Sequence, residues 1–156
     1  MSLWFISRHG EAEPNANTDF ERQLTPQGKE RLNALWQRIG EQTEVELPTA
    51  ILASPYIRAQ QTAAIIARNL SISRIETSEL LVPEASVSQL LTTLSAAPAA
   101  TEPLLIVSHM PFVGRLTSLW RHGIGAPTAS YSVGQVMILK GDACLGGASL
   151  VGQFTQ

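Results

Sequence analysis

Leu3-Trp4-Phe5-Ile6-Ser7-Arg8-His9-Gly10, near the N-terminus, is the segment around which we expect the rest of the chain to be organised. Its apolar first half, with aromatic and β-branched side chains, predicts a buried strand. The strand ends at Arg8, His9 and Gly10, and open α/β sheets place their ligands at the carboxyl ends of strands. Arginine offers a rigid fork of donors to an oxyanion such as phosphate, and a neutral imidazole can attack phosphorus. Gly10 lets the backbone approach a ligand closely. The segment therefore predicts a phosphate site.

A simpler interpretation is that Arg8 and His9 only end a strand and face solvent. The three-residue motif alone does not distinguish the two interpretations. A second copy, Arg121-His122-Gly123, follows a predicted helix rather than a strand, and we interpret it as coincidence. Later segments of the chain favour the active-site interpretation.

Composition predicts one compact domain spanning residues 1–156. The 156 residues are 44% hydrophobic and 15% charged, which is typical of a globular protein and argues against disorder. A net charge of −2 gives no basic surplus for nucleic-acid binding. Any anion site must therefore be made by a few locally placed arginines.

Metal, disulfide and membrane chemistry are not expected. The single cysteine, Cys144, excludes an internal disulfide and a multi-cysteine metal site, and the three histidines lack HExxH spacing. The N-terminus has no basic region and its apolar run is too short for a signal peptide. No apolar stretch approaches the ~18 residues of a transmembrane helix. We expect a soluble cytoplasmic protein without cofactor or metal.

The next segments predict a loop, a helix and a strand. Glu11 to Gln23 is polar and is interpreted as a loop. Thr25-Pro26 is typical of a helix N-cap followed by proline at the first helical position. The helix would end at Gly40, and a strand would follow at 50–53. The buried face of the predicted helix has helical spacing and comprises Leu32, Leu35, Trp36 and Ile39.

A second candidate site segment begins at Ser54. Ser54 suits an N-cap and Pro55 the first helical position, which places Arg58 about one turn into a helix. Helical side chains lean toward the N-terminus, where exposed amides favour an anion. The alternative is a solvated arginine on an amphipathic helix. The predicted buried face of this helix comprises Ala59, Ala63, Ile66 and Leu70.

A third segment, 103–111, is a continuous apolar strand that ends in His109, followed by Pro111 opening a helix. A fully apolar strand predicts a central position covered on both faces. The alternative for His109 is a structural histidine hydrogen-bonded at a strand end. Between the second and third segments we expect a strand or extended connection at Ile75 to Val82, a helix whose buried face is Val87, Leu90, Leu91 and Leu94, and a loop at Ala96 to Glu102. The helix after Pro111 should bury Phe112, Val113, Leu116, Leu119 and Trp120. The last third of the chain predicts an edge hairpin of two strands, Val133 to Leu139 and Ser149 to Phe154.

Together these elements predict an α/β fold. We expect a single-domain three-layer sandwich, with a mostly parallel central sheet flanked by helices and antiparallel strands at its edge.

The chain resembles the histidine phosphatase (phosphoglycerate-mutase-like) superfamily, and most of all its small SixA-type phosphohistidine phosphatases. The resemblance covers nearly the whole chain. The matching segments occur in the family's order and are Arg8-His9-Gly10-Glu11-Ala12, Arg22-Gln23-Leu24-Thr25-Pro26-Gln27-Gly28, Ser54-Pro55-Tyr56-Ile57-Arg58-Ala59-Gln60-Gln61-Thr62 and Val107-Ser108-His109-Met110-Pro111.

The resemblance implies a role for each matched position. His9 would be the nucleophile that becomes phosphorylated, with a backbone carbonyl holding the proton on its other ring nitrogen. Arg8 and Arg58 would grip the phosphoryl oxygens. His109 would complete the pocket, cationic while a phosphoryl group is bound. Arg22 would contact substrate, with an exposed loop arginine as the equal alternative.

One departure from the family concerns the acid that protonates the leaving group. Larger members carry a helical insertion with a carboxylate there, and residues 59–108 leave little room for one between Arg58 and His109. Glu79 and Glu84 lie in this interval, but surface positions suit them better. A missing strong acid fits a labile P–N bond, and a shallow site would admit a histidine on another protein.

We therefore expect a metal-independent phosphohistidine phosphatase, a monomer that acts on a phosphotransfer-domain or phosphorelay protein. The alternatives are a phosphomonoesterase for a small phosphate ester and a binding module that recognises phosphohistidine without turnover. A phosphoglycerate mutase is disfavoured by the missing insertion. A binding module would have no need of the His9 nucleophile.

Overall fold

The computed structural model describes residues 2–97 and 102–156. Its strands are β1 (Ser2–Arg8), β2 (Ala50–Ala53), β3 (Arg74–Thr77), β4 (Leu104–Ser108), β5 (Val136–Gly141) and β6 (Ala148–Phe154). Its α-helices are α1 (Pro26–Gln42), α2 (Ile57–Leu70), α3 (Val87–Ala96) and α4 (Phe112–His122), and its 3-10 helices are η1 (Asp19–Glu21) and η2 (Glu79–Leu81).

The six strands form one mixed sheet in the order β3-β2-β4-β1-β5-β6. Parallel pairing joins β3 to β2, β2 to β4 and β4 to β1. Antiparallel pairing joins β1 to β5 and β5 to β6. The predicted mostly parallel sheet with an antiparallel edge hairpin is therefore confirmed, and the apolar strand β4 is central, as predicted.

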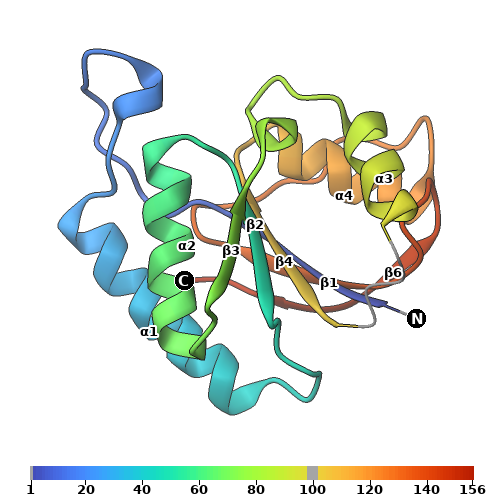
Figure 1. Ribbon diagram of the computed structural model, residues 1–156, viewed down its shortest axis with the longest axis horizontal. Coiled ribbons are helices and arrows are strands. Elements are labelled where there is room, and N and C mark those ends of the chain that lie inside the picture. The colour runs from blue at the N-terminus through green and yellow to red at the C-terminus, as the bar shows by residue number, and fades with distance from the viewer. Residues whose placement is uncertain (1, 98–101) are drawn as a thin grey trace.

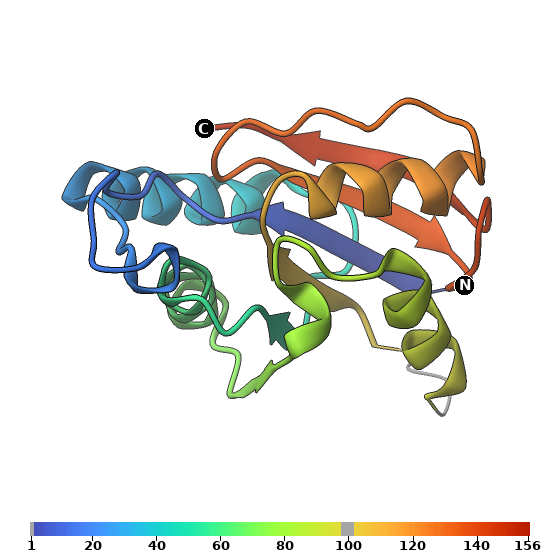
Figure 2. The ribbon, with the colours of Figure 1, turned by 90° about the horizontal axis from the view of Figure 1, so that it is seen from above.

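Helices cover both faces of this sheet, which makes three layers (Figures 1 and 2). Helices α1 and α2 pack on one face, and α3 and α4 on the other. Each face of the sheet has its own hydrophobic core, and β1 contributes to both because its side chains alternate between the faces. Phe5 packs with α1 and α2, whereas Trp4 and Ile6 pack with α3 and α4. The predicted α/β three-layer architecture is confirmed.

Helix α1 begins as the sequence indicates. The Thr25 hydroxyl oxygen accepts from the Gly28 N–H at 2.8 Å, and Pro26 is the first helical residue. The four apolar side chains of the predicted face are all buried. The helix continues to Gln42, so the predicted stop at Gly40 is wrong by two residues. Glycine inside a helix costs only about 1 kcal/mol, and Gly40 lies on the exposed side, where this cost can be met.

Helix α2 begins later than predicted, at Ile57, with Tyr56 at the N-cap position and no side-chain cap. The assignment of Ser54 as N-cap is wrong because Ser54 directly follows β2, where its N–H still donates to the Val107 carbonyl of β4 at 3.0 Å. Arg58 is consequently the second helical residue rather than a full turn in.

Three other boundaries also differ from the prediction. Of the strand or extended connection expected at Ile75 to Val82, only the part in β3 is extended strand, because Ser78 caps η2 by accepting from the Leu80 N–H. Strand β5 begins at Val136 rather than Val133, after Gly134, which has a φ of +71°. Of the loop predicted at Ala96 to Glu102, residues 98–101 lie outside the described residues; Ala96 ends α3.

Candidate active site

The carboxyl ends of β1, β2 and β4 meet at one edge of the sheet. Arg8 is paired in register with Ser108, and the His9 N–H donates to the Ser108 carbonyl at 3.0 Å. Ser54 is tied to β4 in the same way, through Val107. These backbone bonds place His9 and His109 beside each other, with ring centroids 5.2 Å apart.

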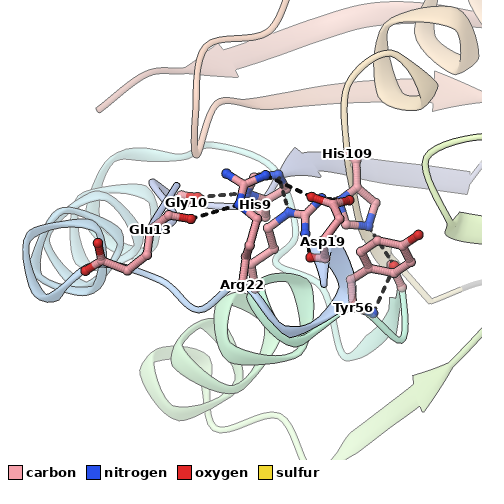
Figure 3. Close-up of polar contacts among 9 residues, drawn as sticks. His9, Gly10, Glu13, Asp19, Arg22, Tyr56 and His109 are labelled. Atoms are coloured by element: carbon pink, nitrogen blue, oxygen red, sulfur yellow. Dashed lines mark hydrogen bonds and ion pairs between the residues drawn. The ribbon is translucent and has the colours of Figure 1, made fainter. Parts of the chain in front are cut away.

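His9 has one ring nitrogen prepared for nucleophilic attack (Figure 3). Its Nδ1 lies 2.7 Å from the Gly10 carbonyl oxygen, which can only accept a hydrogen bond. The ring proton is therefore on Nδ1, and Nε2 keeps its lone pair. The Arg58 Nε–H donates to this Nε2 at 3.2 Å. The expectation that a backbone carbonyl holds the proton on the other nitrogen is confirmed.

The surroundings keep His9 neutral. Burial lowers the pKa of His9 to about 4, and the charges of Arg58, Arg8 and Arg22 act in the same direction. The hydrogen bond with Gly10 acts in the opposite direction and is outweighed. Near neutral pH the lone pair on Nε2 is therefore free of a proton.

Arg58 is buried, which excludes the interpretation of a solvated arginine. Besides His9, it contacts the loop between β1 and α1, where Nη1 donates to the Asp19 carbonyl at 2.7 Å and Nη2 to Asp19 Oδ2 at 3.2 Å. Its guanidinium carbon lies 5.0 Å from the centre of the Tyr56 ring. These contacts hold three of its five N–H donors and leave two for an oxyanion.

Arg8 reaches the site from the end of β1. Its Nη1 donates to the Tyr131 carbonyl at 2.8 Å, whereas its Nε is buried and has no partner among the described residues. Burial, with the charge of Arg58 second, lowers the pKa of Arg8, but a guanidinium remains charged. An unpartnered buried donor on a fixed cation suits a phosphoryl oxygen.

His109 is only 1% exposed, and its Nε2 lies 2.7 Å from Ser54 Oγ. Its Nδ1 has no partner in the part of the chain that the structure describes. Burial and then the neighbouring His9 lower the pKa of His109 to about 3, so the ring is neutral in this structure. That it becomes cationic when a phosphoryl group binds stays a prediction, because added negative charge would raise this pKa.

Arg22 approaches the site through Asp19 (Figure 3). Its Nε donates to the Glu13 carbonyl at 2.8 Å and its Nη1 to Asp19 Oδ1 at 3.0 Å. Arg22 is not a freely exposed loop arginine, because two hydrogen bonds fix its side chain. Its charge contributes to the lowered pKa of His9. A direct contact with substrate stays a prediction.

Four residues that build the site were not predicted from the sequence in this role. Asp19 joins Arg22 to Arg58, and Tyr56 stacks beside Arg58. Thr62 Oγ1 accepts from the Gly10 N–H at 3.1 Å and donates to the Arg58 carbonyl at 2.8 Å. Ser54, read only as a cap, contacts His109. One signal was present for Asp19: an acid three residues before Arg22 can pair with it across one helical turn.

The two glutamates considered as leaving-group acids form no hydrogen bond or ion pair with the described residues around His9. Glu79 and Glu84 are exposed, and within the described residues neither forms a hydrogen bond or ion pair. Both lie near enough to the Tyr56 hydroxyl to contribute, after burial, to its raised pKa. Neither is placed as a proton donor in this structure, and the role stays untested.

Among the described residues, no group of three or more His, Cys, Asp or Glu side chains is placed to hold a metal ion. None of the described helices is long and apolar enough to cross a membrane.

Comparison with known proteins agrees with this geometry. A family model described as histidine phosphatase superfamily (branch 1) matches residues 4–82. The chain belongs to this superfamily. The match includes the segments that carry Arg8, His9, Arg22 and Arg58, and the resemblance stated from the sequence is confirmed.

Individual relatives point to one branch of the superfamily. The chain is 35% identical over 118 residues to the phosphohistidine phosphatase SixA of Escherichia coli, which covers 73% of this chain and 71% of that protein. It is 33% identical to a SixA homologue of Haemophilus influenzae, over 73% and 74% of the two chains. A solved structure of SixA complexed with tungstate superposes with a TM-score of 0.85 at 26% identity, covering 98% of this chain and 96% of that one.

Proposed function

We propose that this histidine phosphatase removes phosphate from phosphohistidine on a signalling or phosphotransfer protein of the cytoplasm, without a metal and through a phosphorylated His9. The observation that carries the proposal is the state of His9, a buried imidazole with its proton fixed on Nδ1 and its lone pair on Nε2. Such a nitrogen is ready to attack phosphorus.

The residues around His9 supply what phosphoryl transfer requires, which is positioning and positive charge against the phosphoryl oxygens. Arg8 Nε and His109 Nδ1 are buried and unpartnered among the described residues, so each can donate to an oxygen. Arg58 adds its two free N–H donors. Water then hydrolyses the phosphohistidine on His9, which returns Nε2 to its starting state.

Two considerations favour phosphohistidine over a phosphate ester. Two relatives, at 35% and 33% identity, are named as a phosphohistidine phosphatase and its homologue, and one solved SixA holds tungstate, an oxyanion that is tetrahedral like phosphate. In addition, Glu79 and Glu84 are exposed, and neither contacts His9, Arg8, Arg58 or His109 by a hydrogen bond or ion pair among the described residues. An imidazole leaving group needs no strong acid, because it can carry its proton on the nitrogen that is not phosphorylated.

The experiment compares a phosphohistidine-carrying phosphotransfer domain with phenyl phosphate as substrates of the purified protein, with a chelator present. We expect fast release of phosphate from the protein substrate and slow release from the ester. The reverse order would contradict the proposal and favour a small-molecule phosphomonoesterase. Binding of the phosphoprotein without phosphate release would instead indicate a recognition module.

A further inference from the structure

An aromatic and acidic surface borders the candidate active site. Phe20 and Tyr56 lie with ring centroids 5.2 Å apart, and Tyr56 meets the His109 ring edge-on at 4.9 Å. Phe20 is 44% exposed, so much of its ring faces solvent. The two rings therefore continue the wall of the site outward from His109 toward solvent.

Asp19 precedes Phe20 in η1 and brings a carboxylate to this wall (Figure 3). Its Oδ2 accepts from Arg58 and its Oδ1 from Arg22, and the side chain remains 56% exposed. Each carboxylate oxygen has two lone-pair directions, so one hydrogen bond to each leaves acceptor capacity open. Partial burial raises the pKa of Asp19, but the hydrogen bonds and charges of Arg22 and Arg58 outweigh it and give a net lowering. The group is therefore an anion and an acceptor, and it is poorly suited to donate a proton.

We propose that Asp19, Phe20 and Tyr56 form the leaving-group subsite of this enzyme and bind the imidazole ring of the substrate phosphohistidine. The substrate ring binds with the nitrogen that is not phosphorylated in its protonated form. The rings of Phe20 and Tyr56 pack against that planar ring, and the Asp19 carboxylate accepts a hydrogen bond from the N–H. The inference rests on the proposed function and names the residues that select the substrate. Aromatic faces and a carboxylate together suit a planar ring that carries positive charge.

The subsite acts on the first chemical step. His9 Nε2 forms a bond to phosphorus while the P–N bond of the substrate breaks, and the electron pair of that bond stays on the substrate nitrogen. The proton held on the other ring nitrogen by Asp19 stays there throughout. The substrate ring therefore departs as neutral imidazole instead of the far more basic imidazolate.

A phosphate ester gains nothing from Asp19. Its leaving oxygen needs a proton donor, and an ionised carboxylate beside it offers only repulsion of the developing negative charge. Phe20 and Tyr56 can still pack against an aryl ester. Asp19 should therefore distinguish imidazole from phenol as a leaving group, whereas Phe20 should distinguish planar from alkyl leaving groups.

The test uses the full-length protein and kcat/KM for three substrates: phosphoimidazole, phenyl phosphate and glycerol phosphate. This parameter covers the steps through phosphoryl transfer to His9, so the later hydrolysis common to all three does not affect it. We expect Asp19→Asn to lower the ratio of kcat/KM for phosphoimidazole to kcat/KM for phenyl phosphate by about tenfold or more, because a charge-assisted hydrogen bond is lost. Phe20→Leu should lower kcat/KM for both planar substrates by several-fold relative to kcat/KM for glycerol phosphate. Glu21→Gln removes a neighbouring exposed carboxylate and should leave all ratios unchanged.

The ratios separate this subsite from a merely structural role. If Asp19 only positions Arg58 and Arg22, Asp19→Asn will slow all three substrates equally, which would overturn the inference. The proposed function fails separately, when the unmodified protein shows no preference for phosphoimidazole over either ester. A preference in the unmodified protein that survives both substitutions would overturn the subsite alone.

Discussion

Replacing His9 with asparagine should make the stability of the protein less sensitive to acid. Burial lowers the pKa of His9 from 6.5 to about 4, so the folded protein resists a proton that the unfolded chain accepts. The stabilisation by neutral His9 is complete above about pH 6.5 and is lost as the pH falls toward about 4. Asparagine does not titrate, and its amide can still donate to the Gly10 carbonyl.

The size of the effect follows from the two pKa values. At about pH 5 the unfolded chain holds nearly one more proton at this position than the folded chain, which corresponds to a loss of about 2 kcal/mol relative to about pH 7.5. His109, with a pKa of about 3, also lowers the free energy of unfolding on acidification, in the unmodified protein and in His9→Asn alike. The measured quantity is the free energy of unfolding by urea at the two pH values.

The matched control is His122→Asn, which changes an exposed histidine in the other Arg-His-Gly sequence. We expect the control to lose as much stability on acidification as the unmodified protein, and His9→Asn to lose about 2 kcal/mol less. Equal losses in all three proteins would refute the assignment of His9 as a buried neutral imidazole.

Two further substitutions test the scaffold of the site. Thr62→Val should cost about 1–3 kcal/mol of unfolding free energy, because the buried Gly10 N–H loses its acceptor, whereas Thr62→Ser should retain most of the stability. Gly28→Ala should also destabilise, since the added Cβ would lie 2.5 Å from the Glu11 carbonyl oxygen. Gly40→Ala should stabilise by about 0.5–1 kcal/mol, because its Cβ would lie 3.9 Å from Leu70 Cδ2, an ordinary contact. Urea and thermal unfolding measure these effects, and a Gly40→Ala variant less stable than Gly28→Ala would contradict the packing described for α1.

The sequence was sufficient for the parts of the fold that depend on local patterns. Apolar runs identified β1 and β4, and helical spacing identified the buried face of α1. His9, Arg8, Arg58 and His109 were correctly expected to gather, because the carboxyl ends of parallel strands share one edge. Their chemical roles remain predictions that activity measurements must test.

The errors arose where tertiary contacts override local propensity. Ser54 and Pro55 have the local signature of a helix start, yet the backbone hydrogen bond from Ser54 to Val107 ties Ser54 to β4 and delays the start of α2. Asp19 lies in a loop without periodicity, so its contact with Arg58, distant in the sequence, could not be seen in advance. Phe20 and Tyr56 become neighbours only when η1 packs beside α2.

The most direct test of the account is to trap the covalent intermediate. The protein is mixed with a phosphotransfer domain carrying radioactive phosphohistidine, quenched in alkali during turnover, and digested to locate the label. We predict an acid-labile, alkali-stable label on the peptide that contains His9, absent from His9→Asn, which should also release no phosphate. Continued phosphate release by His9→Asn, or a label on another residue of the unmodified protein, would contradict the central role of His9.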